Sequence, residues 1–216
     1  MREKPAMREA TSPRETGMKP LLSALAAWAL SLASAAPAAA ASPAAASADL
    51  GPGVGALIPH DLAATDATGA ARKFGDLVGR KGMALFFVRS IDWCPYCRAQ
   101  TLSVDAARAE FERRGLSVVF VSYDPVEKQK AFAKANNVGV TLLSDPKSEI
   151  IDAFGLRNER HVAGRFAGIP HPAAFIVRPD RKIAAKLFEA DYATNDKSYV
   201  NRPEVGAVLA AADGAL

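Results

Sequence analysis

The chain has 216 residues, half of them hydrophobic, which suits one ordinary domain with appendages and excludes a chain that is disordered throughout. Its formal net charge is +4, and it falls to +2 without residues 1–40, because 22 basic and 20 acidic side chains then remain. No block of like charge and no basic-aromatic stripe follows that segment, so we expect no nucleic acid partner.

Residues 1–40 have the pattern of a secretory signal. Met18-Lys19-Pro20 precedes an apolar run at 21–33, and small residues suited to cleavage follow between about Ala35 and Ala48. The apolar run is shorter than the ~20 residues of a membrane span, so an uncleaved anchor is the weaker alternative. Residues 1–17 either lengthen the charged region or precede a true start at Met18. The pattern predicts an exported, periplasmic protein.

The domain is predicted at 55–214, after a linker at 41–54 that is rich in Ala, Pro, Ser and Gly. The predicted elements are an extended segment at 57–66 with a turn at 67–70, a helical turn at 74–79, a strand at 83–88, a helix at 99–114 that Gly115 ends, a strand at 116–122, a helix at 126–137, a strand at 141–143, a helix at 150–156, a hairpin of strands at 173–177 and 182–189, and a last helix at 203–212. Strand 116–122 is apolar on both faces, as central parallel strands are. This order predicts an α/β fold with a central mixed β-sheet flanked by helices.

The only two cysteines, Cys94 and Cys97, lie on the predicted turn between strand 83–88 and the following helix. Pro95 suits the first helical position and leaves Cys94 at the N-cap, where unpaired N–H groups and the positive helix end favour a thiolate. Cys97 lies one turn further in, within reach of Cys94 and more buried. We therefore expect Cys94 to be the attacking sulfur and Cys97 the resolving one.

Other uses of two cysteines fit the sequence less well. A zinc site needs about four ligands, and His60, His161 and His171 show no suitable spacing with the cysteines. Covalent haem attachment needs a histidine directly after Cys97, where Arg98 stands. A fixed disulfide in a binding or structural module remains an alternative, but it would close a very small loop and gain little. We expect redox chemistry without a metal or cofactor.

The pentapeptide Trp93-Cys94-Pro95-Tyr96-Cys97 resembles the Trp-Cys-X-X-Cys active site of thioredoxin-fold proteins, and its Pro-Tyr dipeptide is similar to that of glutaredoxins. Three further segments, 57–77, 121–125 and 142–156, resemble the redoxin branch, which comprises peroxiredoxin-like (AhpC/TSA) and TlpA-like proteins. The resemblance covers about 55–214 and implies a thioredoxin-like fold.

The resemblance also implies a proline in cis opposite the cysteines. Pro172 matches the position, three residues before Phe175, and Pro170 is the alternative. A cis bond there would turn the backbone of His171 toward the sulfurs, free to pair with an extended substrate. Together with Trp93, Pro95 and Tyr96, the pair His171 and Pro172 forms the expected substrate-binding set.

Two reactions are compatible with this motif. One is disulfide exchange with protein disulfides or dithiols, and the other is reduction of hydroperoxides by an antioxidant thiol peroxidase; both use a thiol electron donor that the sequence does not identify. The peroxiredoxin resemblance implies a threonine or serine three residues before the peroxidatic cysteine and an arginine at the start of a later strand. Counted from Cys94, these positions hold Ile91 and Pro172, with Arg89 and Arg98 as substitutes. The sequence thus favours exchange.

The sequence does not identify which residue accepts the proton of the resolving cysteine. The thioredoxin resemblance implies a buried acid beneath it, and the matching residue is Val88. Asp92 is close in sequence, and His171 could accept the proton as a neutral imidazole. Trp93 is expected to pack across the motif and Tyr96 to present its ring to a partner.

Overall fold

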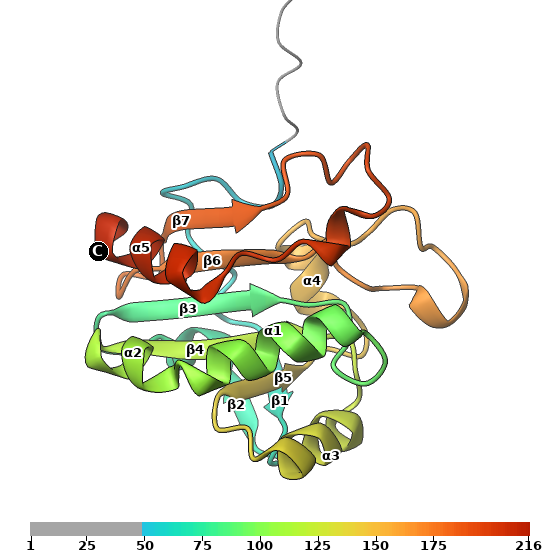
Figure 1. Cartoon of the computed structure of the whole chain (residues 1–216), viewed down its shortest axis with the longest axis horizontal. Coiled ribbons are helices and arrows are strands. Elements are labelled where there is room, and N and C mark those ends of the chain that lie inside the picture. Colours follow the sequence, from blue (N-terminus) through green and yellow to red (C-terminus); the bar gives the residue numbers. More distant parts are fainter. Residues whose placement is uncertain (1–48) are drawn as a thin grey trace, which may run out of the picture. The chain divides into compact units, whose positions relative to one another are not determined.

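The computed structural model describes residues 49–216, so the predicted signal at 1–40 lies outside the described residues (Figure 1). Its elements are β1 (Ala63–Asp66), β2 (Ala71–Lys73), the 3-10 helix η1 (Phe74–Leu77), β3 (Gly82–Phe87), α1 (Pro95–Ala106), α2 (Arg108–Arg113), β4 (Leu116–Ser122), α3 (Val126–Asn136), β5 (Thr141–Ser144), α4 (Glu149–Ala153), the 3-10 helix η2 (Gly164–Phe166), β6 (Ala173–Val177), β7 (Ile183–Phe188), the 3-10 helix η3 (Ser198–Val200) and α5 (Val205–Ala215). Over this range no helix is long and apolar enough to cross a membrane.

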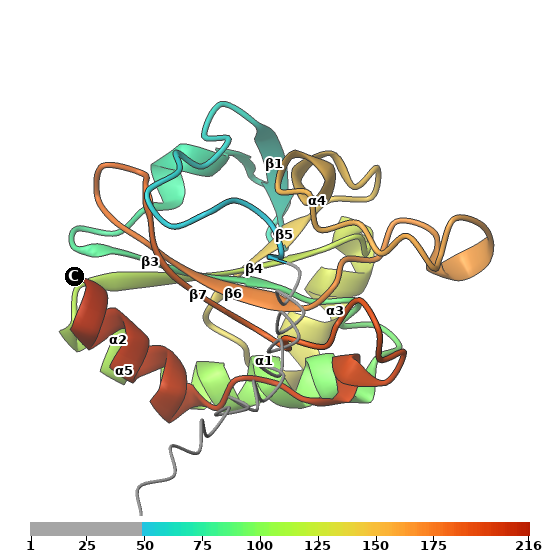
Figure 2. The same cartoon turned by 90° about the horizontal axis from the view of Figure 1, so that it is seen from above.

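Seven strands form one sheet in the order β2-β1-β5-β4-β3-β6-β7. Strand β4 runs parallel to β3 and β5, whereas β1, β6 and β7 pair antiparallel with their neighbours. Helices α1, α2 and α5 cover one face and α4 covers the other (Figure 2). The predicted α/β fold with a mixed sheet and flanking helices is confirmed, as is the central position of strand 116–122.

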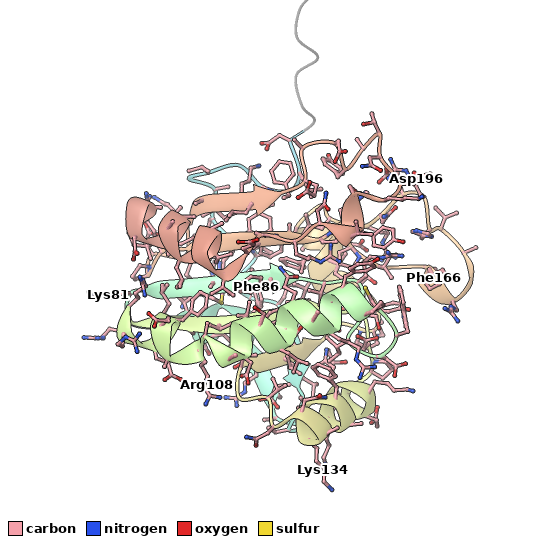
Figure 3. All side chains as sticks on the ribbon, viewed as in Figure 1. Lys81, Phe86, Arg108, Lys134, Phe166 and Asp196 are labelled. Atoms are coloured by element: carbon pink, nitrogen blue, oxygen red, sulfur yellow. The ribbon has the colours of Figure 1, made fainter. Side chains whose placement is uncertain are left out.

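Alternating side chains of β3 fill two cores, one on each face of the sheet. Phe86 faces α1 and stacks on Phe120 of β4, with ring centroids 4.6 Å apart (Figure 3). Phe87 points to the opposite face, where it packs against Phe154 and Phe175. Each fully buried phenylalanine contributes roughly 1.5–3 kcal/mol. This two-sided burial fixes the carboxyl end of β3, from which the cysteine turn starts.

The predicted helix at 99–114 is divided in the structure into α1 and α2. Ala107 leaves the helical conformation, with φ −92° and ψ 8°, and its N–H bonds to the carbonyls of Ser103 and Val104. Val104 and Phe111 are nevertheless both buried in the same core. Apolar spacing reports which face is buried and does not register a one-residue break, which is why a single helix was predicted.

Two local features were not predicted. Strand β2 is exposed along its whole length and has no apolar pattern; its hairpin with β1 depends instead on Asp66, whose carboxylate accepts the N–H groups of Thr68 and Ala70. The packed part of the chain also begins before Gly55. Leu50 is buried in the core that contains Phe87, and Lys186 donates to the carbonyls of Leu50 and Pro52.

Candidate active site

The cysteine turn lies where β3 ends and α1 begins. Cys94 is the N-cap residue of α1 and Pro95 is in its first turn, as predicted. The two sulfurs are 2.8 Å apart and belong to free thiols, since a disulfide bond would be about 2.05 Å long. Cys97 is the more buried of the two, as expected, but Cys94 is almost as enclosed, because Cys94 is 1% exposed and Cys97 0%. Both sulfurs are part of the core between α1 and the sheet.

A cation that the sequence did not reveal lies against the inner sulfur. The Arg202 guanidinium places Nη2 3.5 Å from Sγ of Cys97, although the two residues are 105 positions apart in the chain. Nη1 of Arg202 donates to the carbonyls of Asn201, at 2.8 Å, and of Tyr199. These bonds within the segment between η3 and α5 hold the guanidinium over the cysteine pair.

The environment of the pair makes Cys97 the acidic thiol. Burial opposes ionisation, but the hydrogen bond between the two sulfurs and the charge of Arg202 outweigh it and lower the pKa of Cys97 to about 6. The same hydrogen bond, followed by burial, raises the pKa of Cys94. The N–H at the helix start favours a Cys94 thiolate, as expected, but the cation, which the sequence did not reveal, lies beside Cys97.

A buried carboxylate holds the loop that carries the cysteines. Asp124 accepts hydrogen bonds of 2.7 Å from the hydroxyls of Ser90 and Ser122 and from the backbone N–H of Ile91. Ser90 Oγ in turn accepts the N–H of Trp93 at 3.2 Å. Burial raises the pKa of Asp124, and the two serine hydroxyls act against this effect. Sequence analysis missed Asp124, although it lies two residues after the end of β4, and parallel neighbours end at the same edge of a sheet.

We expect Asp124→Asn to loosen this loop. The amide would place an NH₂ group where one carboxylate oxygen now accepts, leaving a buried donor unpaired at a cost of about 1–3 kcal/mol. Urea unfolding should show the loss. Asp92→Asn is the matched control in the same loop, because Asp92 is exposed and pairs only with Lys128 at 3.3 Å. Equal stability of the two variants would contradict this role.

Aromatic side chains cover the turn. Trp93 Nε1 donates to Tyr123 Oη at 2.9 Å, and its ring packs 4.7 Å from that of Phe166, so it packs across the motif as predicted. Phe166 belongs to the loop that projects beside the site (Figure 3). Tyr96 is 43% exposed and meets Tyr199 edge-on, with centroids 6.0 Å apart. The motif thus has an aromatic surface on both sides.

A protein-family model described as the AhpC/TSA family matches residues 54–186. The chain belongs to the AhpC/TSA family. A candidate peroxiredoxin of Mycobacterium tuberculosis is 30% identical over 123 residues, which are 57% of this chain and 77% of the relative. Peroxiredoxin Bcp of Escherichia coli is 26% identical over 118 residues, 55% of this chain and 74% of the relative. As an AhpC/TSA protein, the chain is a thiol-dependent oxidoreductase.

The fold is similar to solved structures of the same class. The crystal structure of peroxidoxin BcpB from Mycobacterium tuberculosis has a TM-score of 0.60 and 23% identity, and covers 77% of this chain and 98% of the other. This likeness confirms the thioredoxin-like fold that the resemblance implied.

The remaining predicted residues of this AhpC/TSA site differ in their surroundings. Pro172 precedes Ala173, which pairs with Phe87 at the carboxyl end of β3, the strand from which the cysteine turn starts. His171 is buried, and its Nε2 lies 2.8 Å from a carboxylate oxygen of Glu159. Among the described residues, neither His171 nor Asp92 is hydrogen-bonded to a cysteine sulfur.

Two further expectations concern a base and a cation near the AhpC/TSA cysteines. Val88, which matches the position of the buried acid in the thioredoxin resemblance, lies in the core with the cysteines. Arg98 points away, over the ring of Phe132 at 5.5 Å, and is not the cation of the site. Within residues 49–216, no three His, Cys, Asp or Glu side chains are grouped to hold a metal.

Proposed function

We propose that this chain is a thiol peroxidase that reduces hydroperoxides with Cys94 and Cys97. The observation that carries the proposal is the buried sulfur of Cys97 within 3.5 Å of Arg202, in a chain of the AhpC/TSA family. Relatives named peroxiredoxins support this reaction better than the disulfide exchange that the sequence favoured. The partners are a hydroperoxide as substrate and an external thiol as reductant.

In the first step the Cys97 thiolate attacks the terminal oxygen of the hydroperoxide. An S–O bond forms, the O–O bond breaks, and the departing alkoxide takes a proton to become an alcohol. The thiol of Cys94, 2.8 Å away, is the nearest proton donor, and the Arg202 cation lies where negative charge develops. Cys97 is oxidised by two electrons to a sulfenic acid while the peroxide is reduced.

In the second step the Cys94 sulfur attacks the sulfenic sulfur. An S–S bond forms, the S–O bond breaks, and hydroxide leaves as water after taking a proton. The two sulfurs need to approach from 2.8 Å to about 2.05 Å, which requires only a small movement. An external thiol then reduces the disulfide and restores both cysteines.

Cys97 as the attacking sulfur accounts for the missing threonine or serine of the peroxiredoxin pattern. Counted from Cys94, the position three residues earlier holds Ile91, which has no hydroxyl to donate. Counted from Cys97, the same position holds Cys94, whose S–H group can donate to the thiolate. The thiol takes the place of the expected hydroxyl, and Arg202 takes the place of the expected arginine.

Disulfide exchange is the second candidate, and the exposed ring of Tyr96 beside the motif favours it. A protein disulfide must reach the attacking sulfur in line, however, and both sulfurs are at most 1% exposed. A hydroperoxide oxygen is far smaller and requires less opening of the site.

The test is to mix fully reduced protein with one equivalent of cumene hydroperoxide and count free thiols over time. The proposal predicts rapid loss of both thiols with formation of an intramolecular disulfide and release of one equivalent of the alcohol. A parallel reaction with an oxidised protein substrate should be slower. Oxidation by the protein disulfide alone, with no response to peroxide, would contradict the proposal and favour exchange.

We also propose that the protein is exported, with the signal ending between about Ala35 and Ala48. The charged start and apolar run at 18–33 support this proposal. Cell fractionation of the full chain should find a shortened form in the periplasm, and deletion of residues 21–33 should retain the protein in the cytoplasm. Full-length protein in the cytoplasmic fraction would contradict it.

A further inference from the structure

A second buried arginine lies near the cysteine turn, against the ring of Trp93, and the mechanism above does not use it. Arg89 lies two residues after the end of β3 and is 7% exposed. Its guanidinium lies 3.9 Å from the ring centroid of Tyr199 and 5.2 Å from that of Trp93. Its Nε is enclosed without a hydrogen-bond partner. Within residues 49–216, no nitrogen of this guanidinium has a hydrogen bond or an ion pair.

The acidic side chains around this end of the sheet already have other partners. Asp124 accepts from serine hydroxyls, Asp92 pairs with Lys128, Glu159 pairs with His171, and Asp196 pairs with Arg160. Burial and then the charges of Arg89 and Arg160 lower the pKa of His161, so both cations act on the same imidazole, and Asp196 acts against them. A buried charge without a partner is costly, so this arrangement calls for an anion.

The surroundings of Arg89 indicate the chemical class of that anion. Only Nε is fully enclosed, which leaves the two terminal nitrogens of the guanidinium to form the parallel pair of hydrogen bonds that a carboxylate accepts. The rings of Trp93 and Tyr199 lie next to it, and Phe166 packs against Trp93, so the surrounding aromatic surface suits an apolar or aromatic body. A carboxylate on an organic body satisfies both features.

We propose that Arg89 is the anion-binding residue of a substrate subsite, and that the preferred substrates are organic hydroperoxides that carry a carboxylate. This inference rests on the proposed peroxidase function and specifies its substrate class. The carboxylate binds Arg89 and does not react. The hydroperoxide group is reduced at Cys97, with the bonds made and broken as described above.

The experiment compares two hydroperoxides that differ by one carboxylate group. Cumene hydroperoxide is neutral, and 4-(2-hydroperoxypropan-2-yl)benzoate adds a carboxylate to the same ring. In the wild-type protein, kcat/KM for the anionic substrate should exceed that for the neutral one by about tenfold or more, as expected for hydrogen bonds to a charged group. In Arg89→Gln the ratio should fall to about one. Any loss common to both substrates cancels in this ratio.

Arg98→Gln is the matched control, because it removes a positive charge from the same motif but from a side chain that lies over Phe132. Its ratio should stay close to that of the wild type. Arg89→Lys keeps the charge without the paired donors and should give an intermediate ratio. A wild-type ratio near one, or an equal fall in Arg89→Gln and Arg98→Gln, would overturn the subsite.

A binding measurement separates failure of the subsite from failure of the peroxidase function. The unreactive 4-isopropylbenzoate should bind the reduced wild-type protein in calorimetry and bind Arg89→Gln at least about tenfold more weakly. If neither peroxide is turned over, the function is wrong, and this binding still tests the subsite. If Arg89→Gln binds the probe as well as the wild type, the subsite is wrong. The thiolate absorbance of Arg89→Gln should titrate as in the wild type, and a large change in its midpoint would instead show that Arg89 stabilises the thiolate.

Discussion

Cys97→Ser is expected to abolish peroxide turnover, with kcat/KM falling by roughly a thousandfold or more, because an alcohol cannot replace a thiolate as the attacking group. Cys97 carries the lowered pKa, and Arg202 lies 3.5 Å from its sulfur, so the variant loses the one ionised sulfur of the site. The measurement is the initial rate of peroxide loss with a thiol reductant in excess.

The companion variant Cys94→Ser distinguishes the roles of the two cysteines. It should still react once with peroxide and then stop at a sulfenic acid on Cys97, because the resolving sulfur is missing. Trapping with a carbon nucleophile followed by peptide mass spectrometry locates the modified residue. A trapped sulfenic acid on Cys94 in Cys97→Ser, with none on Cys97 in Cys94→Ser, would reverse the assignment in favour of Cys94 as the attacking sulfur.

Arg202→Gln should give the second largest effect. Removing the cation raises the pKa of Cys97, because a nearby opposite charge favours the thiolate. The acid limb of the pH-rate profile then moves to higher pH, and at a pH below this limb the rate falls, by roughly tenfold if the pKa rises by one. At a pH above the raised pKa, the thiolate fraction recovers. The measurement is kcat/KM for hydrogen peroxide from pH 5 to 9.

Arg98→Gln is the control for this profile, since Arg98 is in the same helix as Cys97 but is not in contact with a sulfur. If Arg202→Gln and Arg98→Gln gave the same profile as the wild type, Arg202 would have no part in ionising the cysteine. A uniform loss of rate at every pH would assign Arg202 to binding of the peroxide alone.

The sequence was sufficient for those parts of the fold that depend on local patterns. Pro95 and Cys94 were correctly predicted at the start of α1, because the first positions of a helix have marked preferences. The apolar run at 116–122 was correctly predicted as a central strand, because a strand covered on both faces has few polar residues. Strand β3 pairs with this central strand and leads into α1, so the position of the cysteine turn at its carboxyl end could also be predicted.

The electrostatics of the site were not predictable in the same way. Arg202 reaches Cys97 from a segment after η3, and nothing in its local sequence distinguishes it from the other arginines. The acidity of the two cysteines was predicted from the helix end alone, whereas the distant cation decides it. The preference for exchange had the same origin, because the comparison with peroxiredoxins was counted from Cys94 and not from Cys97.

The near-complete enclosure of Cys94 was not predicted, for a physical reason. A residue at the start of a helix is usually near the surface, but here the segment at 198–202 and the ring of Trp93 add to the cover over the motif. Such cover comes from tertiary packing and leaves no signal near the cysteines.

The thiolate absorbance at 240 nm of the reduced protein, followed between pH 4 and 9, reports directly on whether Arg202 ionises the cysteine pair. We expect one thiolate per chain with a midpoint near 6, and a midpoint at higher pH in Arg202→Gln. Absence of thiolate absorbance below about pH 8, or a titration that Arg202→Gln does not change, would contradict this role of Arg202.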